Sequence, residues 1–294
     1  MASAGFVYRV NKENAMNQDE IRKLREIALD VRIKTINEIA SFGQGHIGGS
    51  MSVVELLVYL YFHEMRIRPQ EPEWIERDRL VLSKGHSGPA LYAVLASKGY
   101  FEESWLSTLN KGGTRLPSHA DMTKTPGIDF TAGSLGQGFS AAVGIALAQR
   151  MRKLDSYTYV VVGDGESQEG EVWEAAEAAG AWKLGNLIGF TDLNGQQLDD
   201  YTDNIIPMHD LKKRYETYGW EALEIDGHDF SAIEAAIAKA KSIKDKPVMI
   251  IMHTIKSYGY IPGEDIRANH SMQIDKSKAE EAIAALIKRE EARK

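Results

Sequence analysis

Two short segments place oxygen-bearing side chains directly after apolar stretches of the chain. Gly163-Asp164-Gly165 is one of them, and Asp192-Leu193-Asn194 is the other. A carboxylate and a carboxamide oxygen that meet at one spot suit Mg²⁺, which takes few protein ligands and completes its octahedral shell with phosphate oxygens and water. We therefore predict Asp164 and Asn194 as metal ligands, with the backbone carbonyl of Gln196 as a third.

Each segment alone could be no more than a turn, because Gly-Asp-Gly and Asn194-Gly195 are both common turn formers. Their separation, however, accommodates one helix and one strand. This spacing brings both turns to the same edge of a parallel sheet. Together they indicate a site more strongly than either does alone.

The surrounding sequence alternates between short apolar runs and helical patterns. Strands are predicted at 80–82, 157–162, 187–191 and 248–252, separated by helices such as 138–151 and 171–182. This alternation predicts an α/β fold with a parallel sheet and helices on both faces. Ligands of such sheets bind beyond the carboxyl ends of the strands. The candidate positions are therefore 83–86, 163–165, 192–194 and 253–256.

Helix boundaries are indicated near both ends of the chain. Asn17 and Glu20 form a capping pair for a helix that ends near Gly43, and Ser52 and Glu55 repeat that spacing before a helix over 53–61. A glycine-rich loop is expected over 43–50. The domain division is an N-terminal arm (1–18), one domain (19–275) and a C-terminal helix (276–294) with Ala279, Ile283 and Leu286 on one side.

Composition limits the classes of function. The 294 residues are 43% hydrophobic, and 35 basic and 42 acidic side chains give a formal net charge of -7, which argues against a nucleic-acid partner. With no cysteine, a metal must be held by oxygen or imidazole ligands. No signal peptide and no apolar run of about 20 residues is evident, so we expect a soluble, cytoplasmic protein without a membrane partner.

The segment 163–200, GDGESQEGEVWEAAEAAGAWKLGNLIGFTDLNGQQLDD, resembles the thiamine-diphosphate motif of transketolases. Further segments similar to that family are GHIGGSMS (45–52), RDRLVLSKGHSGPALY (77–92), GSLGQG (133–138) and KRYETYGWE (213–221). The resemblance implies the thiamine-diphosphate-binding fold, as a diphosphate-binding domain. It also implies ketol transfer, in which a two-carbon unit passes from a ketose to an aldose.

The resemblance assigns roles to individual residues. Asp164, Asn194 and the Gln196 carbonyl match the ligands of Mg²⁺, in whose place Ca²⁺ or Mn²⁺ could stand. Lys256 matches a basic residue near the diphosphate. Cofactor-contacting positions are Gly133, Ser134, Leu135, Gly163 and Gly165. Glu169, placed among the catalytic groups, and Glu174 match acids that join the cofactor sites of partner subunits, although a solvated helix start would also favour glutamate.

Four of the eight histidines lie in segments similar to the family: His46, His86, His119 and His270. Cleavage of a ketose moves protons between hydroxyl and carbonyl oxygens, and imidazole is suited to that task near neutral pH. By resemblance, all four line the thiazolium and the donor sugar, and His86 and His270 also contact the cofactor. His209 and His228 have no such context, and we interpret them as structural or exposed.

Some positions depart from the family pattern. Ile47 follows His46 where proline is common, Asp200 replaces a usual glycine, and Asn269 and Ser271 flank His270 in place of the frequent Trp and Gly. These differences concern the substrate more than the cofactor. In the family, the groups that hold the far phosphate of the substrate lie largely on domains that this sequence does not contain, so a pentose phosphate, a branched sugar phosphate and a sulfonated sugar all stay open.

Transketolases have a further, pyrimidine-binding domain that supplies the glutamate activating the cofactor's aminopyrimidine, and this sequence does not contain it. The partner that we therefore expect is a second transketolase subunit, in a heterotetramer with two copies of each chain. The alternative is a shortened chain.

Three other interpretations compete. Gly136-Gln-Gly138-Phe-Ser-Ala141 fits a loose dinucleotide-binding pattern with Asp155 as the ribose acid, but the preceding polar, proline-containing segment is no buried strand. The second interpretation is a related thiamine enzyme, either a deoxyxylulose-phosphate synthase or a 2-oxoacid dehydrogenase subunit. A non-catalytic scaffold subunit that kept the fold is the third.

Overall fold

The structure is a computed structural model that describes residues 16–293. The N-terminal arm predicted for residues 1–18 therefore lies almost entirely outside the described residues. No helix of the described part is both long and apolar enough to cross a membrane.

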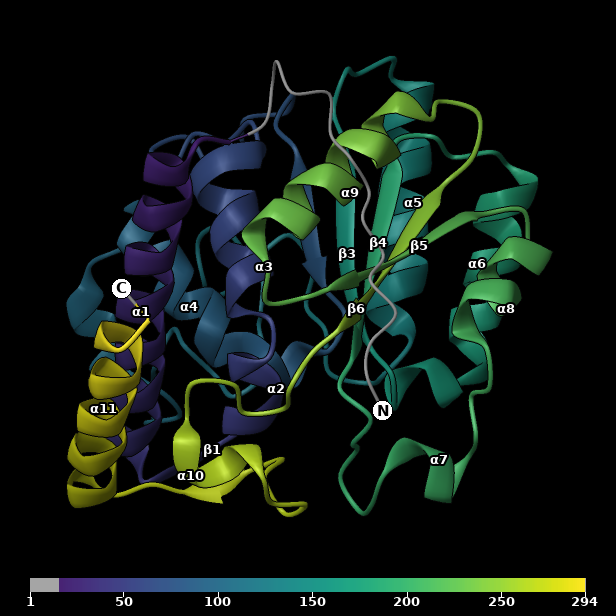
Figure 1. Ribbon diagram of the computed structural model, residues 1–294. Helices are drawn as coiled ribbons and strands as arrows, with labels where there is room; N and C mark the ends of the chain where they lie inside the picture. The colour runs from purple at the N-terminus through teal and green to yellow at the C-terminus, as the bar shows by residue number, and fades with distance from the viewer. Residues whose placement is uncertain (1–15, 294) are drawn as a thin grey trace.

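The chain alternates between helices and strands, as Figure 1 shows. The α-helices are α1 (Gln18–Phe42), α2 (Ile47–Met51), α3 (Val54–Tyr59), α4 (Gly88–Lys98), α5 (Gln137–Met151), α6 (Gly170–Ala181), α7 (Thr202–Ile205), α8 (Leu211–Thr217), α9 (Phe230–Ser242), α10 (Ile261–Glu264) and α11 (Lys276–Glu291). The strands are β1 (Gln44–Gly45), β2 (Arg79–Leu82), β3 (Thr158–Gly163), β4 (Leu187–Leu193), β5 (Glu221–Asp226), β6 (Val248–His253) and β7 (Met272–Gln273). A π-helix, η1 (Leu60–Glu64), and 3-10 turns at η2 (Gly85–Ser87), η3 (Glu103–Thr108) and η4 (Glu166–Gln168) complete the fold.

Five strands form one parallel sheet in the order β2-β3-β4-β6-β5, and β1 pairs with β7 in a separate antiparallel ribbon. The pairing register places the last residues of β3, β4 and β6 side by side, because Gly163 pairs with Asp192 and Leu193 pairs with His253. The predicted α/β fold with a parallel sheet is confirmed.

The sheet is covered on both faces because successive side chains of a strand point in opposite directions. Tyr159 and Val161 of β3 belong to a core shared with α1, α3, α4 and α9, whereas Val160 and Val162 pack in a second core with α5, α6 and α8. Figure 1 shows α1, α3 and α4 on one side of the sheet and α5, α6 and α8 on the other. Such double burial explains why these strands are continuous apolar runs.

The boundaries predicted for the first helix are confirmed. The Asn17 side chain accepts hydrogen bonds from the backbone N–H groups of Asp19 and Glu20, each at 3.0 Å, and Glu20 accepts from the Asn17 N–H at 2.8 Å. Gly43 ends α1 with a φ of 95°, a left-handed conformation that glycine adopts without steric cost.

The capping pair predicted at Ser52 and Glu55 is wrong. Val53 is the N-cap of α3, without a side-chain cap. The Ser52 hydroxyl instead donates to the carboxylate of Asp192 at 2.7 Å, and Glu55 forms a buried ion pair with Arg32. Both side chains are used in long-range contacts, which a local spacing rule cannot detect.

Two further expectations need correction. The segment predicted as the glycine-rich loop 43–50 contains the short strand β1 and most of helix α2. The sequence pattern also missed β5. This edge strand carries acidic residues among its apolar ones, so it lacks the continuous apolar run that identified β3 and β4.

The C-terminal helix begins after Asp275, whose carboxylate accepts the N–H of Lys278 at 2.9 Å. α11 lies along α1 in Figure 1. Its predicted apolar side is confirmed, because Ala279 and Leu286 are buried and Ile283 packs against them.

A buried ion pair joins α1 to α3. Arg32 Nη2 lies 2.6 Å from Glu55 Oε1, and His228 Nδ1 lies 3.1 Å from the other carboxylate oxygen. Burial alone would raise the pKa of Glu55, but Arg32 and His228 outweigh burial and lower it to about 2. Its charge therefore stabilises the fold above the pKa of the unfolded chain, and this stabilisation is lost as the pH falls toward 2.

We expect Glu55→Gln to reduce the fall in the free energy of unfolding between pH 5 and pH 3. Between pH 5 and pH 3 the unfolded chain takes up a proton at Glu55 and the native chain does not, so the wild type loses about 2 kcal/mol more than the variant. Urea unfolding at several pH values measures this difference. Glu280→Gln, at an exposed site, serves as the control and should follow the wild type. Parallel curves for wild type and Glu55→Gln would contradict the prediction.

Candidate active site

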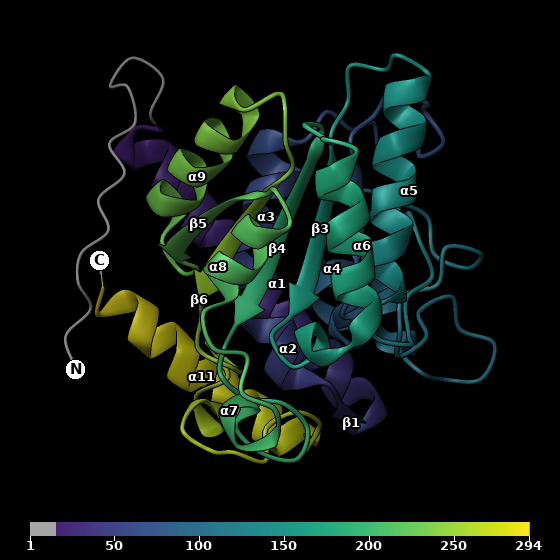
Figure 2. The same cartoon turned by 90° about the vertical axis from the view of Figure 1, so that its right-hand side faces the viewer.

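The loops after the strands gather at one edge of the sheet. Figure 2 shows β3 and β4 ending toward α2 and α7, and the residues that follow β2, β3, β4 and β6 all lie at this edge. The structure thus brings together the four segments that the sequence pointed to, at 83–86, 163–165, 192–194 and 253–256. We call this region the carboxyl edge.

The structure also brings together the four predicted histidines. The ring of His46 lies between 5.3 and 5.6 Å from the rings of His86, His119 and His270, measured between centroids. His86 and His270 are 4.8 Å apart. They come from the start of α2, from η2 and from two irregular loops, so only the tertiary fold creates the cluster.

All four imidazoles are poised to be neutral near pH 7. Burial lowers the pKa of His46 and of His119. Burial and the nearby Lys84 hold the pKa of His86 well below its usual range, and burial with Lys256 lowers that of His270 to about 3. A neutral imidazole offers one hydrogen-bond donor and one acceptor, which suits contact with hydroxyl and carbonyl oxygens.

Asp164 lies in the turn after β3 and is 2% exposed. Its carboxylate accepts the N–H of Gly165 at 2.8 Å and the N–H of Gly195 at 2.6 Å, so it contacts the loop that carries Asn194. Burial and the neighbouring Asp192 raise the pKa of Asp164 to about 7. A bound cation would favour the ionised form of this carboxylate.

Asp192 is fully buried at the end of β4 and forms an ion pair with Lys84 at 2.5 Å. It also accepts hydrogen bonds from Ser52 at 2.7 Å, from the Asn194 amide at 2.9 Å and from Thr254. Burial would raise the pKa of Asp192, but Lys84 outweighs burial and lowers it. Asp192 thereby orients the Asn194 side chain, because it occupies the amide nitrogen and leaves the oxygen for other partners.

The other predicted metal and diphosphate groups converge on the same loop. Lys256 Nζ lies 3.2 Å from the carbonyl oxygen of Gln196, and the Asn194 amide oxygen accepts the Gln196 N–H at 3.0 Å. Burial lowers the pKa of Lys256 to about 8, so the amine is still mostly cationic at neutral pH. A cation thus lies beside the predicted metal ligands.

Glu166 connects the loop before α5 to the Asp164 turn. It accepts the backbone N–H groups of Gly136 at 2.9 Å and Gly163 at 3.0 Å, and it accepts the hydroxyl of Ser83. The predicted cofactor positions Gly133, Ser134 and Leu135 precede this anchor, and the first two are exposed. Glu166 holds this loop at the carboxyl edge.

Sequence reasoning missed Lys84, Asp192 and Glu166 as the groups that position the site. All three are charged and nearly fully buried. Their placement at the end of a strand or in the turn that follows one was a partial signal, because charged residues are rarely buried unless they are paired.

The predicted acids Glu169 and Glu174 are exposed at the start of α6, where Glu169 is the N-cap residue. The structure does not bring them into the histidine cluster. Their role between subunits stays a prediction.

The dinucleotide-binding interpretation finds no support in the fold. In the described chain, the segment between η3 and α5 is irregular, so no strand precedes Gly136. Asp155 lies just before β3, at the opposite edge of the sheet.

Buried polar atoms without partners mark the carboxyl edge as a place for a ligand. Within residues 16–293, such atoms include Oγ of Ser87 and Ser257, Oε1 of Gln196 and Gln197, and Oδ1 of Asn269. Buried polar groups normally have a hydrogen-bond partner. A polar ligand with several donors and acceptors would satisfy them.

Segments of the chain pack so closely at this edge that two positions favour glycine. A Cβ atom at Gly48 would lie 2.4 Å from the carbonyl oxygen of Asn269, and one at Gly49 would lie 3.2 Å from His86 Nε2.

Residues 16–293 contain no group of three or more His, Cys, Asp or Glu side chains arranged to hold a metal. A metal here needs amide, carbonyl and ligand oxygens, as the set Asp164, Asn194 and Gln196 offers.

The sequence of the chain matches a known protein family. Residues 23–286 match the family model "Transketolase, thiamine diphosphate binding domain".

The chain belongs to the transketolase family.

Relatives within this family include separate subunits. The chain is 50% identical over 273 residues to the 6-deoxy-6-sulfo-D-fructose transketolase subunit SqwG of a Clostridium species, covering 93% of this chain and 99% of that one. It is 37% identical over 245 residues to one subunit of the apulose-4-phosphate transketolase of Phocaeicola vulgatus, covering 83% and 87%. A crystal structure of a variant transketolase from Pichia stipitis aligns with a TM-score of 0.85 at 32% identity, covering 90% of this chain and 40% of that one.

We expect Lys84→Met to destabilise the fold by about 3–5 kcal/mol, because it leaves the Asp192 carboxylate buried without a counter-charge. The double variant Lys84→Met/Asp192→Asn should be more stable than Lys84→Met alone. Urea unfolding of the two single variants and the double variant gives the coupling energy.

Lys241→Met is the matched control, since Lys241 pairs with Glu64 at 2.6 Å but is 39% exposed. Its cost should stay under about 1 kcal/mol. If the Lys84 and Lys241 variants lost equal unfolding free energy, Lys84 would not be needed to neutralise the buried Asp192 charge.

Proposed function

We propose that this chain catalyses thiamine-diphosphate-dependent ketol transfer, together with a second subunit that carries a pyrimidine-binding domain. The observation that carries the proposal is the convergence of four neutral histidines beside the buried Asp164 turn. Membership in the transketolase family supports it.

In this proposal, Asp164, Asn194 and the Gln196 carbonyl hold Mg²⁺, or Ca²⁺ or Mn²⁺ in its place. Lys256 lies next to this set and is mostly cationic at neutral pH, so it would attract the diphosphate. Gly133, Ser134, Leu135, Gly163 and Gly165 offer backbone surface to the cofactor. The unpartnered Ser257 hydroxyl is a further hydrogen-bond donor at this edge.

The histidine cluster would act on the sugar. Thiamine diphosphate, when bound, supplies the nucleophilic carbon that attacks the ketose carbonyl and carries the two-carbon unit. His46, His86, His119 and His270 then donate to the carbonyl oxygen and accept protons from hydroxyl groups, since each neutral ring has one donor and one acceptor. Burial, with Lys84 and Lys256, keeps the rings neutral and so preserves the acceptor nitrogen.

An apolar surface beside the site supports a protein partner. Exposed apolar side chains follow β4 and β6 at the carboxyl edge: Leu198 is 65% exposed, Tyr201 49%, Ile206 53% and Ile255 47%. Large exposed apolar patches mark interaction sites. With relatives that are named as subunits and matched over nearly their whole length, this surface supports a heteromer, which we propose contains two copies of each chain.

For the substrate, we propose a ketose with an anionic terminal group, and 6-deoxy-6-sulfo-D-fructose is the first candidate. The relative named for that sugar is 50% identical to this chain, whereas the relative named for apulose 4-phosphate is 37% identical. A pentose phosphate and a branched sugar phosphate are the comparison substrates.

We expect Asp164→Ala to abolish magnesium-dependent binding of thiamine diphosphate. A ligand that binds only the native state at about 100 times its Kd stabilises it by about 2.7 kcal/mol, so the wild type should gain several degrees in Tm when cofactor and Mg²⁺ are added together. Thermal unfolding with each component alone and with both measures the effect. Asp245→Ala, an exposed site, is the control and should keep the full shift.

The same variants separate catalysis from a scaffold role when the partner subunit is present. Ketol transfer from 6-deoxy-6-sulfo-D-fructose to an aldose should be lost with Asp164→Ala and retained with Asp245→Ala. Full activity of the Asp164→Ala complex would mean that this chain only supports its partner.

A further inference from the structure

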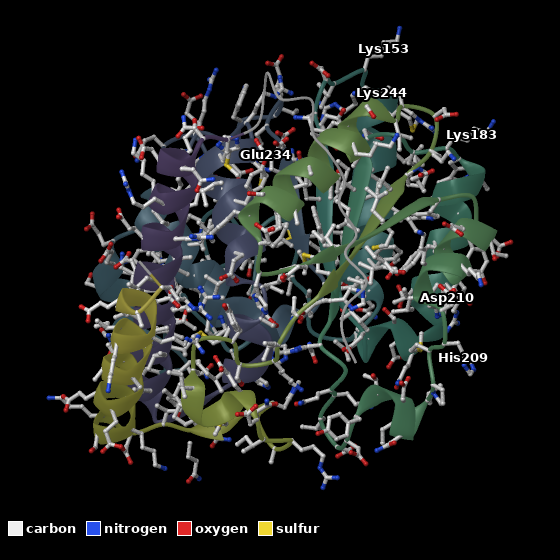
Figure 3. All side chains as sticks on the ribbon, viewed as in Figure 1. Lys153, Lys183, His209, Asp210, Glu234 and Lys244 are labelled. Carbon is white, nitrogen blue, oxygen red and sulfur yellow. The ribbon has the colours of Figure 1, made fainter. Side chains whose placement is uncertain are left out.

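The amino edge of the sheet, opposite the histidines, carries a second cluster of chemically active residues. A hollow of about 380 Å³ is lined there by the loops that lead into β3, β4 and β6. Its lining includes Arg150, Lys153, Lys183 and Lys244, with Asp155 as the one acidic residue. We call this feature the amino-edge hollow, and Figure 3 shows Lys153 and Lys244 at the end of the molecule away from α7.

The concentration of cations contrasts with the acidic chain around it. The whole protein has a formal net charge of -7, yet Arg150 from the last turn of α5 and three lysines from separate loops meet here. Within residues 16–293, none of Lys153, Lys183 and Lys244 forms an ion pair. Lys244 instead donates to the hydroxyl of Tyr157. Asp155 lines the same hollow but forms no ion pair with these lysines, so their charges are open to an anion.

Two of these lysines occupy backbone positions where glycine is the usual residue. Lys153 has a φ of 56° and Lys183 a φ of 52°, and they follow the last turns of α5 and α6. Helices that end in this left-handed conformation generally use glycine there. Non-glycine residues in sparsely populated conformations cluster at functional sites. Here two lysines with a left-handed backbone lie beside one hollow.

Helix dipoles alone do not explain the lysines. The carboxyl ends of α5 and α6 point at this edge and favour nearby cations. However, Arg150 already donates to the carbonyl of Trp182 at 2.5 Å and lies 3.4 Å from that of Lys183, so one cation is already present at the end of α6. The Lys183 amine is thus not required for that purpose.

Two buried side-chain oxygens in the lining have no partner. The Ser156 hydroxyl is one of them, on a residue that is 3% exposed, and the Asn186 amide oxygen is the other. Asn186 Nδ2 donates to the Ala146 carbonyl at 2.9 Å, which fixes the amide and leaves the oxygen as an acceptor. A hydroxyl can donate to a phosphate oxygen, whereas an amide oxygen requires a donor on the ligand.

We propose that the amino-edge hollow binds a small hydroxylated phosphate ester. Lys153, Lys183 and Lys244 contact the phosphate, the Ser156 hydroxyl donates to a phosphate oxygen, and the Asn186 amide oxygen accepts a ligand hydroxyl. The volume lies within the range of small-molecule sites. This site is separate from the proposed catalytic site and does not depend on the proposed function.

Titration of the full chain with glycerol 3-phosphate, followed by amide NMR shifts, tests the proposal. Saturable shifts are expected at Lys153, Lys183, Gly185 and Asn186, and glycerol at equal concentration should produce none. Separate reporters at the carboxyl edge, Gly133, Gly165 and Gly195, distinguish this site from the one for the cofactor diphosphate.

The triple variant Lys153→Gln/Lys183→Gln/Lys244→Gln should weaken binding at least tenfold. The matched control Lys213→Gln/Lys276→Gln/Lys288→Gln removes the same charge from exposed sites elsewhere and should leave the affinity unchanged. Far-UV circular dichroism of both variants verifies folding. The proposal is overturned by an absence of saturable shifts at the hollow, by equal shifts with glycerol, or by equal weakening in both triple variants.

Discussion

Asp192 is a fully buried carboxylate at the end of β4, the central strand of the sheet, and the carboxyl edge is organised around its charge. An isolated carboxylate is costly to bury. Lys84 neutralises it from the loop after β2, and Ser52, Thr254 and Asn194 satisfy its remaining lone pairs. One charge therefore fixes four segments relative to one another, and these segments carry Asn194, Gln196 and two of the histidines, while Asp164 joins them through the Gly195 N–H.

The same electrostatics set the protonation states at this edge. Burial, together with Lys84 and Lys256, lowers the pKa values of His86 and His270, so these rings keep an acceptor nitrogen. Burial and, after it, the Asp192 charge raise the pKa of the neighbouring Asp164. A divalent cation bound at Asp164 would compensate that cost. The carboxyl edge is thus polar and has buried hydrogen-bonding groups without partners. A ligand that brings both a cation and phosphate oxygens would be stabilised there.

The sequence predicted those site residues that are marked by their immediate neighbours in the chain, and it missed those whose roles depend on distant partners. Asp164 and Asn194 could be found because each follows a buried apolar strand in a glycine-containing turn, and parallel strands bring such turns to one edge. The positioning roles of Lys84, Asp192 and Glu166 were missed, because they depend on partners such as Ser83, Gly136 and the Lys84–Asp192 pair itself that are distant in sequence. Ser52 and Glu55 had capping spacing but serve long-range contacts with Asp192 and Arg32. The edge strand β5 was missed because Glu221, Glu224 and Asp226 interrupt its apolar pattern.

We propose that this chain holds the diphosphate end of the cofactor while another chain activates the thiazolium. Exchange of the thiazolium C2 proton for deuterium, measured by NMR with bound thiamine diphosphate and Mg²⁺, tests it most directly. We expect exchange near the rate of the free cofactor with this chain alone, and exchange faster by orders of magnitude once the pyrimidine-binding subunit is added. Fast exchange with this chain alone, or no acceleration by the second subunit, would contradict the claim.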